Sequence, residues 1–573
     1  MSGEDASRAH LQELSAILTE FYSTADAGRQ REIDGLLAEF KAHPESWRHA
    51  QYFLASVGLL QTEQSGQYVL FYATLIFEEF VRRFWTEADE GSKAEIRGFL
   101  LQFLTSEAGA SLPPFVFTKL AKVNVDVAKR DWPASYPAFM ETVLAGLAGD
   151  EAGRSVGLAL LRLTAEEFVS DRAADVPADR KAELKLLLSA QLPSILGLLF
   201  GLLDTGVQGG CSPATCQAGL ETLQQLFSWV PLSEHVTPAR LQTLCKYTVT
   251  HAADALGLLA LGCLNELLSK NYVPLEFGDF LRVCFEHIGT LLELVAAHSA
   301  DQTYVSDHDE ESFADKVVQF TLAFFTNHLS RVEGADGFDT PRLLGLLYAV
   351  TYGRPGLSSR ELLRGAECWD YFAEYVLEHK QDTALVASYG AGLLAVLDAA
   401  VPTLLFEKNG DMLAELLEEE PELAGMGADD AEALWGTGED GEEAVAETPS
   451  ELAEFTAAGI ELVGKIVELY PQAGVERAFA QWTASWETFA AAHAAGGSPD
   501  TLCGLARDVG LLLQVPPQTK PHQQSTSGQF GTKSLILAPL SLISCGAGCA
   551  TSSSQDSMSQ SGRLLEPRQS IPS

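Results

Sequence analysis

The sequence predicts an all-α protein: an α-solenoid of HEAT-like helical hairpins that forms a superhelix and ends in a disordered C-terminal tail. Three observations predict this class. Apolar residues recur every three or four positions along most of the 573 residues. Short breaks that contain Pro separate these stretches. Pairs of stretches occupy about 40 to 47 residues, which is typical of HEAT and armadillo repeats. The alternative, one globular all-α bundle, would exceed the usual size of a single core.

The region from Val69 to Trp85 shows the pattern most clearly. Two acidic-to-basic pairs, Glu78 with Arg82 and Glu79 with Arg83, have the i,i+4 spacing that supports a helix. The apolar positions are Val69, Ala73, Ile76, Phe77, Phe80 and Phe84. The same period returns within 256–267, 313–324 and 452–466. We therefore expect amphipathic helices along most of the chain.

One short segment could be a strand instead. Val123, Val125 and Val127 alternate, but Leu120, Val123 and Val127 fit a helix equally well and no hairpin turn follows, so we predict a helix. Short turns between helices are expected at four breaks. They are Trp132-Pro133, Trp229-Val230-Pro231, Asn271-Tyr272-Val273-Pro274 and Tyr470-Pro471.

Two segments depart from the helical pattern. The segment from Glu407 to Glu454 contains 17 acidic residues and one Lys, a net charge of −16, and 425–449 within it is expected to be a solvated loop. From about Pro516 onward Ser, Gln, Gly and Pro dominate and the helical period stops. This tail is expected to be disordered.

These patterns suggest a division of the chain into seven segments. They are an N-terminal helix (1–30), an N-terminal repeat region (31–105), two runs of HEAT repeats (106–260 and 261–406), the acidic insertion (407–454), further HEAT repeats (455–515) and the low-complexity tail (516–573).

The charge of the chain excludes some partners. It carries 78 acidic and 38 basic residues, a formal net charge of −40. Such a surface repels phosphate backbones and anionic lipid headgroups, so we expect neither nucleic acid nor a membrane as a partner. Partners with basic patches or apolar anchors fit better.

The two most apolar stretches and the N-terminus do not indicate the secretory route. Charged side chains interrupt the apolar residues of 1–18, so this segment lacks the continuous apolar run of a signal sequence, and none is expected. The stretches 186–203 and 535–550 are interrupted by polar residues or Pro and fall short of a membrane span. No Asn is followed at the second position by Ser or Thr, so cytosolic or nuclear residence with reduced thiols is the expectation.

No catalytic, metal or cofactor site is predicted. Gly436, Gly438 and Gly441 form a G-x-G-x-x-G pattern, but no strand precedes it and acidic neighbours would repel a pyrophosphate. The consecutive residues 307–311 (DHDEE) cannot easily wrap a metal ion, and Cys211 with Cys216 lacks a second pair at zinc spacing, so both are expected to lie in loops. The other helical cysteines are expected in the core. These are Cys263, Cys284 and Cys368.

Several motifs follow one another in an order that resembles a known family. Residues 31–40 (REIDGLLAEF), 43–47 (HPESW) and 82–85 (RRFW) resemble the importin-β N-terminal region. Residues 119–133 (KLAKVNVDVAKRDWP) are similar to a stretch with which exportins end one helix and begin the next. Two further segments match one exportin branch. They are 226–233 (LFSWVPLS) and 263–277 (CLNELLSKNYVPLEF). The chain thus resembles the exportins of the importin-β family.

This resemblance implies a nuclear export receptor that shuttles between nucleus and cytoplasm. Its implied partners are the GTPase Ran in its GTP-bound form, Phe-Gly-repeat nucleoporins of the pore and, from the branch that it matches, actin with profilin as cargo. No chemistry by this chain is implied. Members of the family are considerably longer solenoids, so the resemblance also predicts a chain that is truncated at its C-terminus.

The resemblance suggests two Ran-binding regions. In the family the second helix of each early pair faces Ran, and we expect these helices at about 47–59, 92–105 and 132–147. On the first of them Arg48, Gln51 and Tyr52 lie off the apolar face. The second region is the acidic insertion, which resembles an acidic loop that meets a basic patch of Ran. Its candidate residues are Asp429, Asp430, Glu439, Asp440, Glu442 and Glu443.

Two other classes of function stay open at this point. A solenoid scaffold or an import receptor would share the helical pattern but not cargo loading that depends on Ran-GTP. A hydrolase or transferase would need a pocket of convergent polar groups, which the sequence does not indicate.

Overall fold

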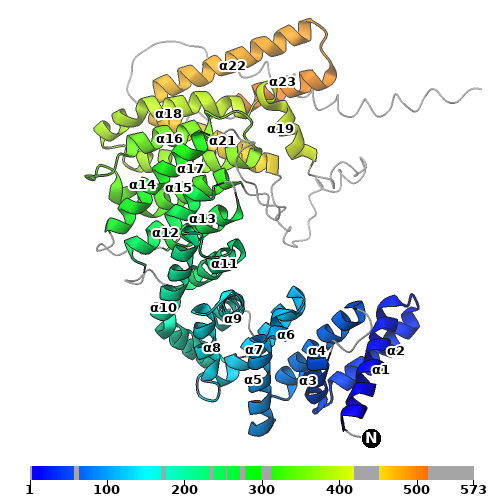
Figure 1. Cartoon of the computed structure of the whole chain (residues 1–573). Coiled ribbons are helices and arrows are strands. Elements are labelled where there is room, and N and C mark those ends of the chain that lie inside the picture. The colour runs from blue at the N-terminus through cyan, green and yellow to red at the C-terminus, as the bar shows by residue number, and fades with distance from the viewer. Residues whose placement is uncertain are drawn as a thin grey trace, which may run out of the picture. The chain divides into compact units, whose positions relative to one another are not determined.

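The computed structural model describes residues 3–56, 63–169, 176–230, 236–252, 254–270, 278–297, 312–418 and 451–513. These ranges contain 22 α-helices and no β-strand (Figure 1). The all-α prediction is confirmed, and residues 123–127 are helical. The chain divides into two compact units, Met1–Val283 and Cys284–Ser573.

The first unit is a stack of helical hairpins. Helices that follow one another pack as pairs, namely α3/α4, α5/α7, α8/α9, α10/α11 and α12/α13. The second members of these pairs also contact each other in chain order and form one layer, while α10 contacts its fellow first helices α8 and α12. The helices are α1 (Gly3–Ser23), α2 (Ala27–Lys41), α3 (Ser46–Ser56), α4 (Glu63–Arg83), α5 (Glu90–Leu104), α6 (Glu107–Ala110), α7 (Pro114–Asp131), α8 (Ala138–Leu147), α9 (Glu151–Val169), α10 (Ala178–Val207), α11 (Pro213–Trp229), α12 (Pro238–Thr250) and α13 (Ala255–Leu268).

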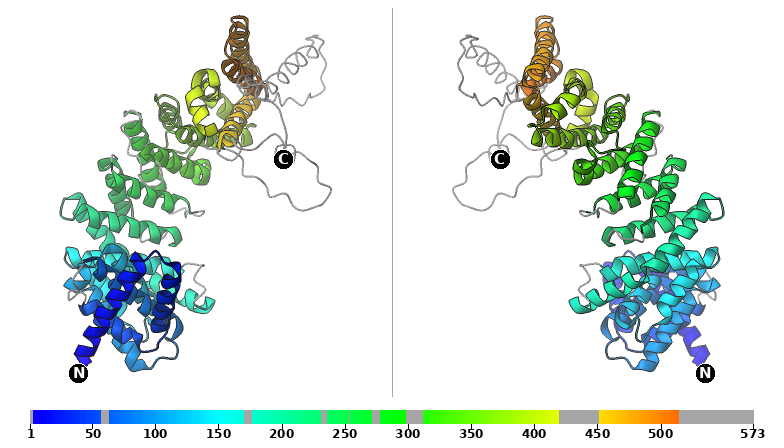
Figure 2. Two further views of the ribbon diagram at one scale, coloured as in Figure 1. Left: turned by 90° about the vertical axis from the view of Figure 1, so that its right-hand side faces the viewer. Right: turned by 90° about the vertical axis from the view of Figure 1, so that its left-hand side faces the viewer.

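The second unit repeats this organisation, as the views in Figure 2 show. Its pairs are α16/α17, α18/α21 and α22/α23; the first helices α16, α18 and α22 form one layer, and α15, α17 and α21 form the other. The helices are α14 (Gly278–Ala296), α15 (Phe313–Val332), α16 (Thr340–Thr351), α17 (Ser359–Glu378), α18 (Thr383–Thr403), α19 (Phe406–Glu418), α21 (Glu451–Leu469), α22 (Pro471–Ala494) and α23 (Pro499–Leu512).

Local sequence explains where helices begin and end. Helix α7 ends at Asp131, directly before Trp132-Pro133, α11 ends at Trp229 and α22 begins at Pro471, so three of the four predicted breaks are confirmed. The fourth, at 271–274, lies outside the described residues. Capping boxes start α15 and α17, where Ser312 and Ser358 exchange hydrogen bonds with the residue three positions later.

Helices α10 and α18 are long and apolar enough to cross a membrane by length and composition alone. For α10 this finding differs from the expectation that the polar residues and Pro in 186–203 exclude a membrane-spanning helix. Core helices of folded domains pass the same test. Here α10 buries Leu188, Leu192 and Leu199 and packs against α9, α11 and α12, so core packing accounts for its apolar composition.

Candidate functional site

The layer of second helices in the first unit is tied together by ion pairs between neighbouring hairpins. Lys119 of α7 lies 2.7 Å from Glu78 of α4, and Arg162 of α9 lies 2.5 Å from Glu221 of α11. Between these two pairs, Glu167 of α9 binds Lys122 and Lys129 of α7. Because each pair bridges two helices, the series fixes the register of successive hairpins.

Glu167 sits at the most buried of these contacts. Burial alone would raise its pKa, but hydrogen bonds from Lys122 and Lys129 outweigh this effect, so the pKa of Glu167 is lowered. The Lys129 side chain is only 5% exposed and also binds Asp126 at 2.9 Å. Glu167 thus stays charged, and the groups of this cluster bind each other rather than an outside ligand.

Two family motifs meet in a second buried network. Asp131, in the motif 119–133, accepts hydrogen bonds from Nη1 of Arg97 at 2.6 Å and from Nε1 of Trp85 at 3.1 Å. Nearby, Oη of Tyr136 lies 2.7 Å from Oδ1 of Asn124. The Arg97 side chain is 8% exposed. This network joins the turn that follows α4 to α5 and α7.

The end of the same motif is also structural. The Arg180 guanidinium of α10 donates to the main-chain carbonyl oxygens of Lys129, at 3.1 Å, and of Trp132, and thereby satisfies groups that the end of α7 leaves unpaired. Trp132 is buried and packs against Phe168. The motif therefore identifies a packing arrangement and offers little surface to a partner, which its sequence alone did not reveal.

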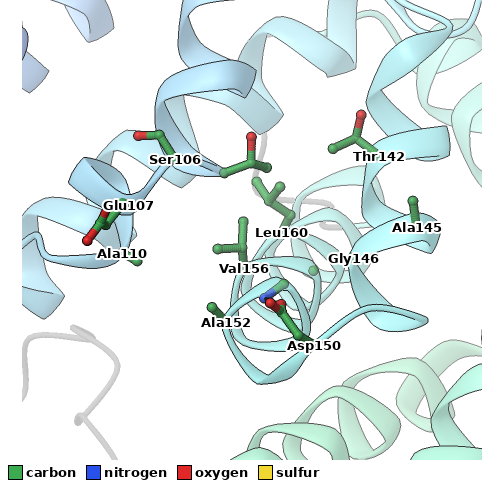
Figure 3. A pocket seen from close by; sticks show the side chains of 13 residues that line it. Ser106, Glu107, Ala110, Thr142, Ala145, Gly146, Asp150, Ala152, Val156 and Leu160 are labelled. Carbon is green, nitrogen blue, oxygen red and sulfur yellow. Dashed lines mark hydrogen bonds between the residues drawn. The ribbon is translucent and has the colours of Figure 1, made fainter.

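Two hollows lie over the N-terminal half of α9 and share Ala110, Ala152 and Val156. The first, about 450 Å³, lies between the ends of α6, α8 and α9 (Figure 3). The second, about 690 Å³, runs across α7, α9 and α11 and is edged by the exposed Thr118 and Ser155. This second hollow lies on the second-helix layer.

The predicted Ran-binding residues on α3 lie at its surface. Arg48 is exposed, with Gln51 and Tyr52 partly so, and the Arg48 guanidinium stacks over Trp47 at 4.4 Å and pairs with Glu45 at 2.6 Å. Their helix, however, is the first member of its pair. The expectation that 47–59, 92–105 and 132–147 are second helices is wrong. Each range corresponds to the first helix of its pair, because α3, α5 and α8 each pack onto the second helix that comes after them in the chain, namely α4, α7 and α9.

Other predicted features lie entirely outside the described residues. These features are the six acidic candidates at Asp429, Asp430, Glu439, Asp440, Glu442 and Glu443, the glycine pattern at 436–441 and the acidic stretch 307–311. Cys263, Cys284 and Cys368 are buried, as expected. Cys216 is not in a loop but in the first turn of α11, where it is buried beside Tyr247. No cluster of three potential metal ligands occurs among the described side chains.

Comparison with known proteins places these features in a family. Residues 35–106 match the importin-β N-terminal domain and residues 113–264 match the exportin 1-like protein family. Exportin-6 from Danio rerio is 31% identical over 500 residues, which cover 73% of this chain and 43% of that protein. Exportin-6 from Homo sapiens is 28% identical over 543 residues, 82% of this chain and 45% of that protein.

A solved structure is also similar. The exportin Cse1 in its cargo-free, cytoplasmic state aligns with a TM-score of 0.41 and 11% identity over 84% of this chain and 44% of that chain. The family assignment rests on the sequence matches alone. The chain spans less than half the length of the curated relatives named above. With an importin-β N-terminal domain followed by an exportin 1-like region, it belongs to the importin-β family and is a homologue of exportin-6.

Proposed function

We propose that this chain acts as a nuclear export receptor that binds Ran-GTP and cargo cooperatively and shuttles between nucleus and cytoplasm. The observation that carries the proposal is the order of the two domains together with the similarity to exportin-6. The importin-β family consists of transport receptors and not of enzymes, so the proposed activity requires no chemistry by this chain.

The hairpin stack suits such a role physically. Each hairpin contacts mainly its neighbours, so a stack offers an extended surface and can adjust its curvature when a ligand binds. If Ran-GTP and cargo favour the same curvature, each raises the affinity for the other, with a coupling free energy on the order of 1–3 kcal/mol.

The proposed cargo is actin together with profilin, and the similarity to exportin-6 supports it. The test is binding of the actin–profilin complex to the purified full chain with Ran locked in its GTP or GDP form. Retention of actin only with Ran-GTP would support the export role. Retention that ignores the nucleotide would favour a scaffold, and release of cargo by Ran-GTP would favour an import receptor.

Two alternative surfaces are proposed for Ran on the first unit, and the six acidic residues of the insertion are a separate candidate. One surface comprises Arg48, Gln51 and Tyr52. The other follows from the corrected pairing: since the family resemblance places Ran against second helices, the exposed side of α4, α7 and α9 is the stronger candidate. The hollow edged by Thr118 and Ser155 lies on this second surface.

The acidic insertion is proposed to accelerate association with Ran. Charges of one sign spread over a segment act mainly on the association rate and are screened beyond about 8 Å at physiological salt. Replacing its six acidic candidates by Asn and Gln should slow Ran-GTP association most at low salt, as measured by stopped flow. Equal rates for variant and wild type at both low and high salt would leave the insertion with only a role in solubility.

A binding slot for Phe-Gly repeats is proposed in the second unit. The family resemblance places such slots between outer helices, and the first helices α16 and α18 enclose an apolar hollow of about 330 Å³. Leu344, Tyr348 and Leu393 line it, with Trp369 and Phe372 of α17. Its size and lining suit one aromatic side chain.

Filling this hollow should weaken binding to a Phe-Gly-repeat resin. Gly392 lines it, and a Cβ added there would meet no atom within 4 Å, so Gly392→Leu is expected to place its side chain over the slot. Gly98→Leu on α5 is the matched control, because its Cβ also meets open space. Retention of Gly392→Leu equal to that of the control would rule out this slot, and failure of wild type to bind would count against shuttling.

A further inference from the structure

Helix α22 carries a row of large apolar side chains along one face, which we call the aromatic stripe: Val475, Phe479, Trp482, Trp486 and Phe489. Trp482, Trp486 and Phe489 are partly buried, and the Nε1 atom of Trp482 is buried. Successive ring centroids lie 5.7, 6.2 and 5.8 Å apart. The first two pairs are stacked and the Trp486–Phe489 pair is tilted, and the two indole planes lie within 9° of parallel. Phe479 is 59% exposed and Val475 46%. Only Gly474 and Ser485 of α22 are buried. A stripe of this kind usually marks a contact surface.

The position of α22 in its layer indicates what kind of contact is missing. Among the described first helices of the second unit, α18 packs between α16 and α22 and buries Leu393, Val396 and Leu397. Helix α22 contacts α18 in this layer. Among the described first helices, α18 thus has two neighbours, α16 and α22, whereas α22 has one, α18. The aromatic stripe lies on the helix with one neighbour.

The sequence after α23 contains one segment with the complementary composition. Residues 535–543 read LILAPLSLI, an apolar run within a region that is otherwise rich in Ser, Gln and Gly. Residues 514–573 carry four basic and two acidic side chains, in a chain whose net charge is −40. Electrostatic attraction between the slightly basic region 514–573 and the acidic remainder of the protein favours association within the chain. We propose that residues 535–543 dock on the aromatic stripe and cover it.

Chain length permits this contact. Helix α23 ends at Leu512 and packs on α22, and the 22 residues from 513 to 534 can span at most about 70 Å. The stripe itself extends for about 21 Å along the helix axis. Because both surfaces belong to one chain, their effective concentration is on the order of millimolar. Intramolecular docking should therefore outcompete a second copy of the protein at micromolar concentration.

The test is hydroxyl-radical footprinting of the full chain, read on the peptide that contains Phe479, Trp482, Trp486 and Phe489. Leu537→Asp with Leu540→Asp places two charges in the docking run and should raise labelling of this peptide several-fold. Leu564→Asp with Leu565→Asp makes the same change elsewhere in the tail and should leave labelling at the wild-type level.

A reciprocal variant tests the contact from the other side. Phe479→Ser is tolerated by the fold because the side chain is largely exposed, and it should speed trypsin cleavage after Lys533 but not after Arg563. Equal labelling of wild type and both tail variants would overturn the proposal. So would wild-type labelling that falls as protein concentration rises, since a second copy would then cover the stripe. Neither result depends on Ran or cargo, so the export proposal is tested separately.

Discussion

Replacing Asp131 by Ala is expected to lower the free energy of unfolding of the first unit by about 3 kcal/mol. The substitution removes the carboxylate that accepts hydrogen bonds from Arg97 and Trp85. The Arg97 guanidinium, whose side chain is 8% exposed, would then stay buried with one fewer anionic partner. A buried charge that loses its buried partner is among the most destabilising local changes.

The remaining partner of Arg97 provides a matched control. Glu90 also binds this guanidinium, but its side chain is 65% exposed, so Glu90→Ala should cost well under about 1 kcal/mol. The double variant Arg97→Met with Asp131→Leu removes both charges and should recover most of the stability. Scanning calorimetry of the full chain compares the three. An Asp131→Ala loss no larger than that of Glu90→Ala would show that the network does not stabilise the unit.

The helices could be predicted because burial imposes a period that the sequence displays directly. The three valines at 123, 125 and 127 show the limit of this rule, since their alternation also suits a strand. The wider spacing with Leu120 suited a helix equally well, and the absence of a hairpin turn after it led to the prediction of a helix, which α7 confirms. Local signals such as Pro471 at the start of α22 then fixed several ends.

The pairing of helices could not be predicted with the same rules. The family resemblance placed 47–59 as a second helix, yet α3 packs mainly on α4, the helix that follows it. The reason lies in the apolar faces: Trp47 of α3 is buried against Phe80 of α4, with ring centroids 6.0 Å apart. Which faces complement each other is a property of two distant segments, and periodicity within one segment does not contain it.

The candidate site was hidden for a related reason. Lys119 and Glu78 are 41 residues apart in the sequence, and Arg162 and Glu221 are 59 residues apart. No spacing within one segment therefore predicts either ion pair. Glu78 was expected to support α4 through Arg82 and instead reaches α7, while Arg82 binds Glu79. The sequence motifs pointed to the right family, but most of their side chains serve the interior of the stack.

Charge on the second-helix layer is expected to weaken Ran-GTP binding more than charge on α3. Thr118→Arg with Ser155→Arg adds two long cationic side chains at the edge of the hollow across α7, α9 and α11, where both native side chains are exposed. If Ran lies against this layer, the variant should lose at least about tenfold in affinity, which corresponds to about 1.4 kcal/mol. Isothermal titration calorimetry with Ran-GTP measures it.

The matched comparison is Arg48→Glu with Tyr52→Ala on α3. The Arg48 guanidinium is already paired with Glu45 and stacked on Trp47. Surface pairs of this kind contribute little to stability. Both the Arg48/Tyr52 variant and the Thr118/Ser155 variant should therefore retain the helicity of wild type by circular dichroism. Because α3 is a first helix, we expect this variant to bind Ran-GTP within about threefold of wild type, less than 1 kcal/mol. A larger loss here than in the Thr118 and Ser155 variant would return the Ran-binding surface to α3 and reject the second-helix layer.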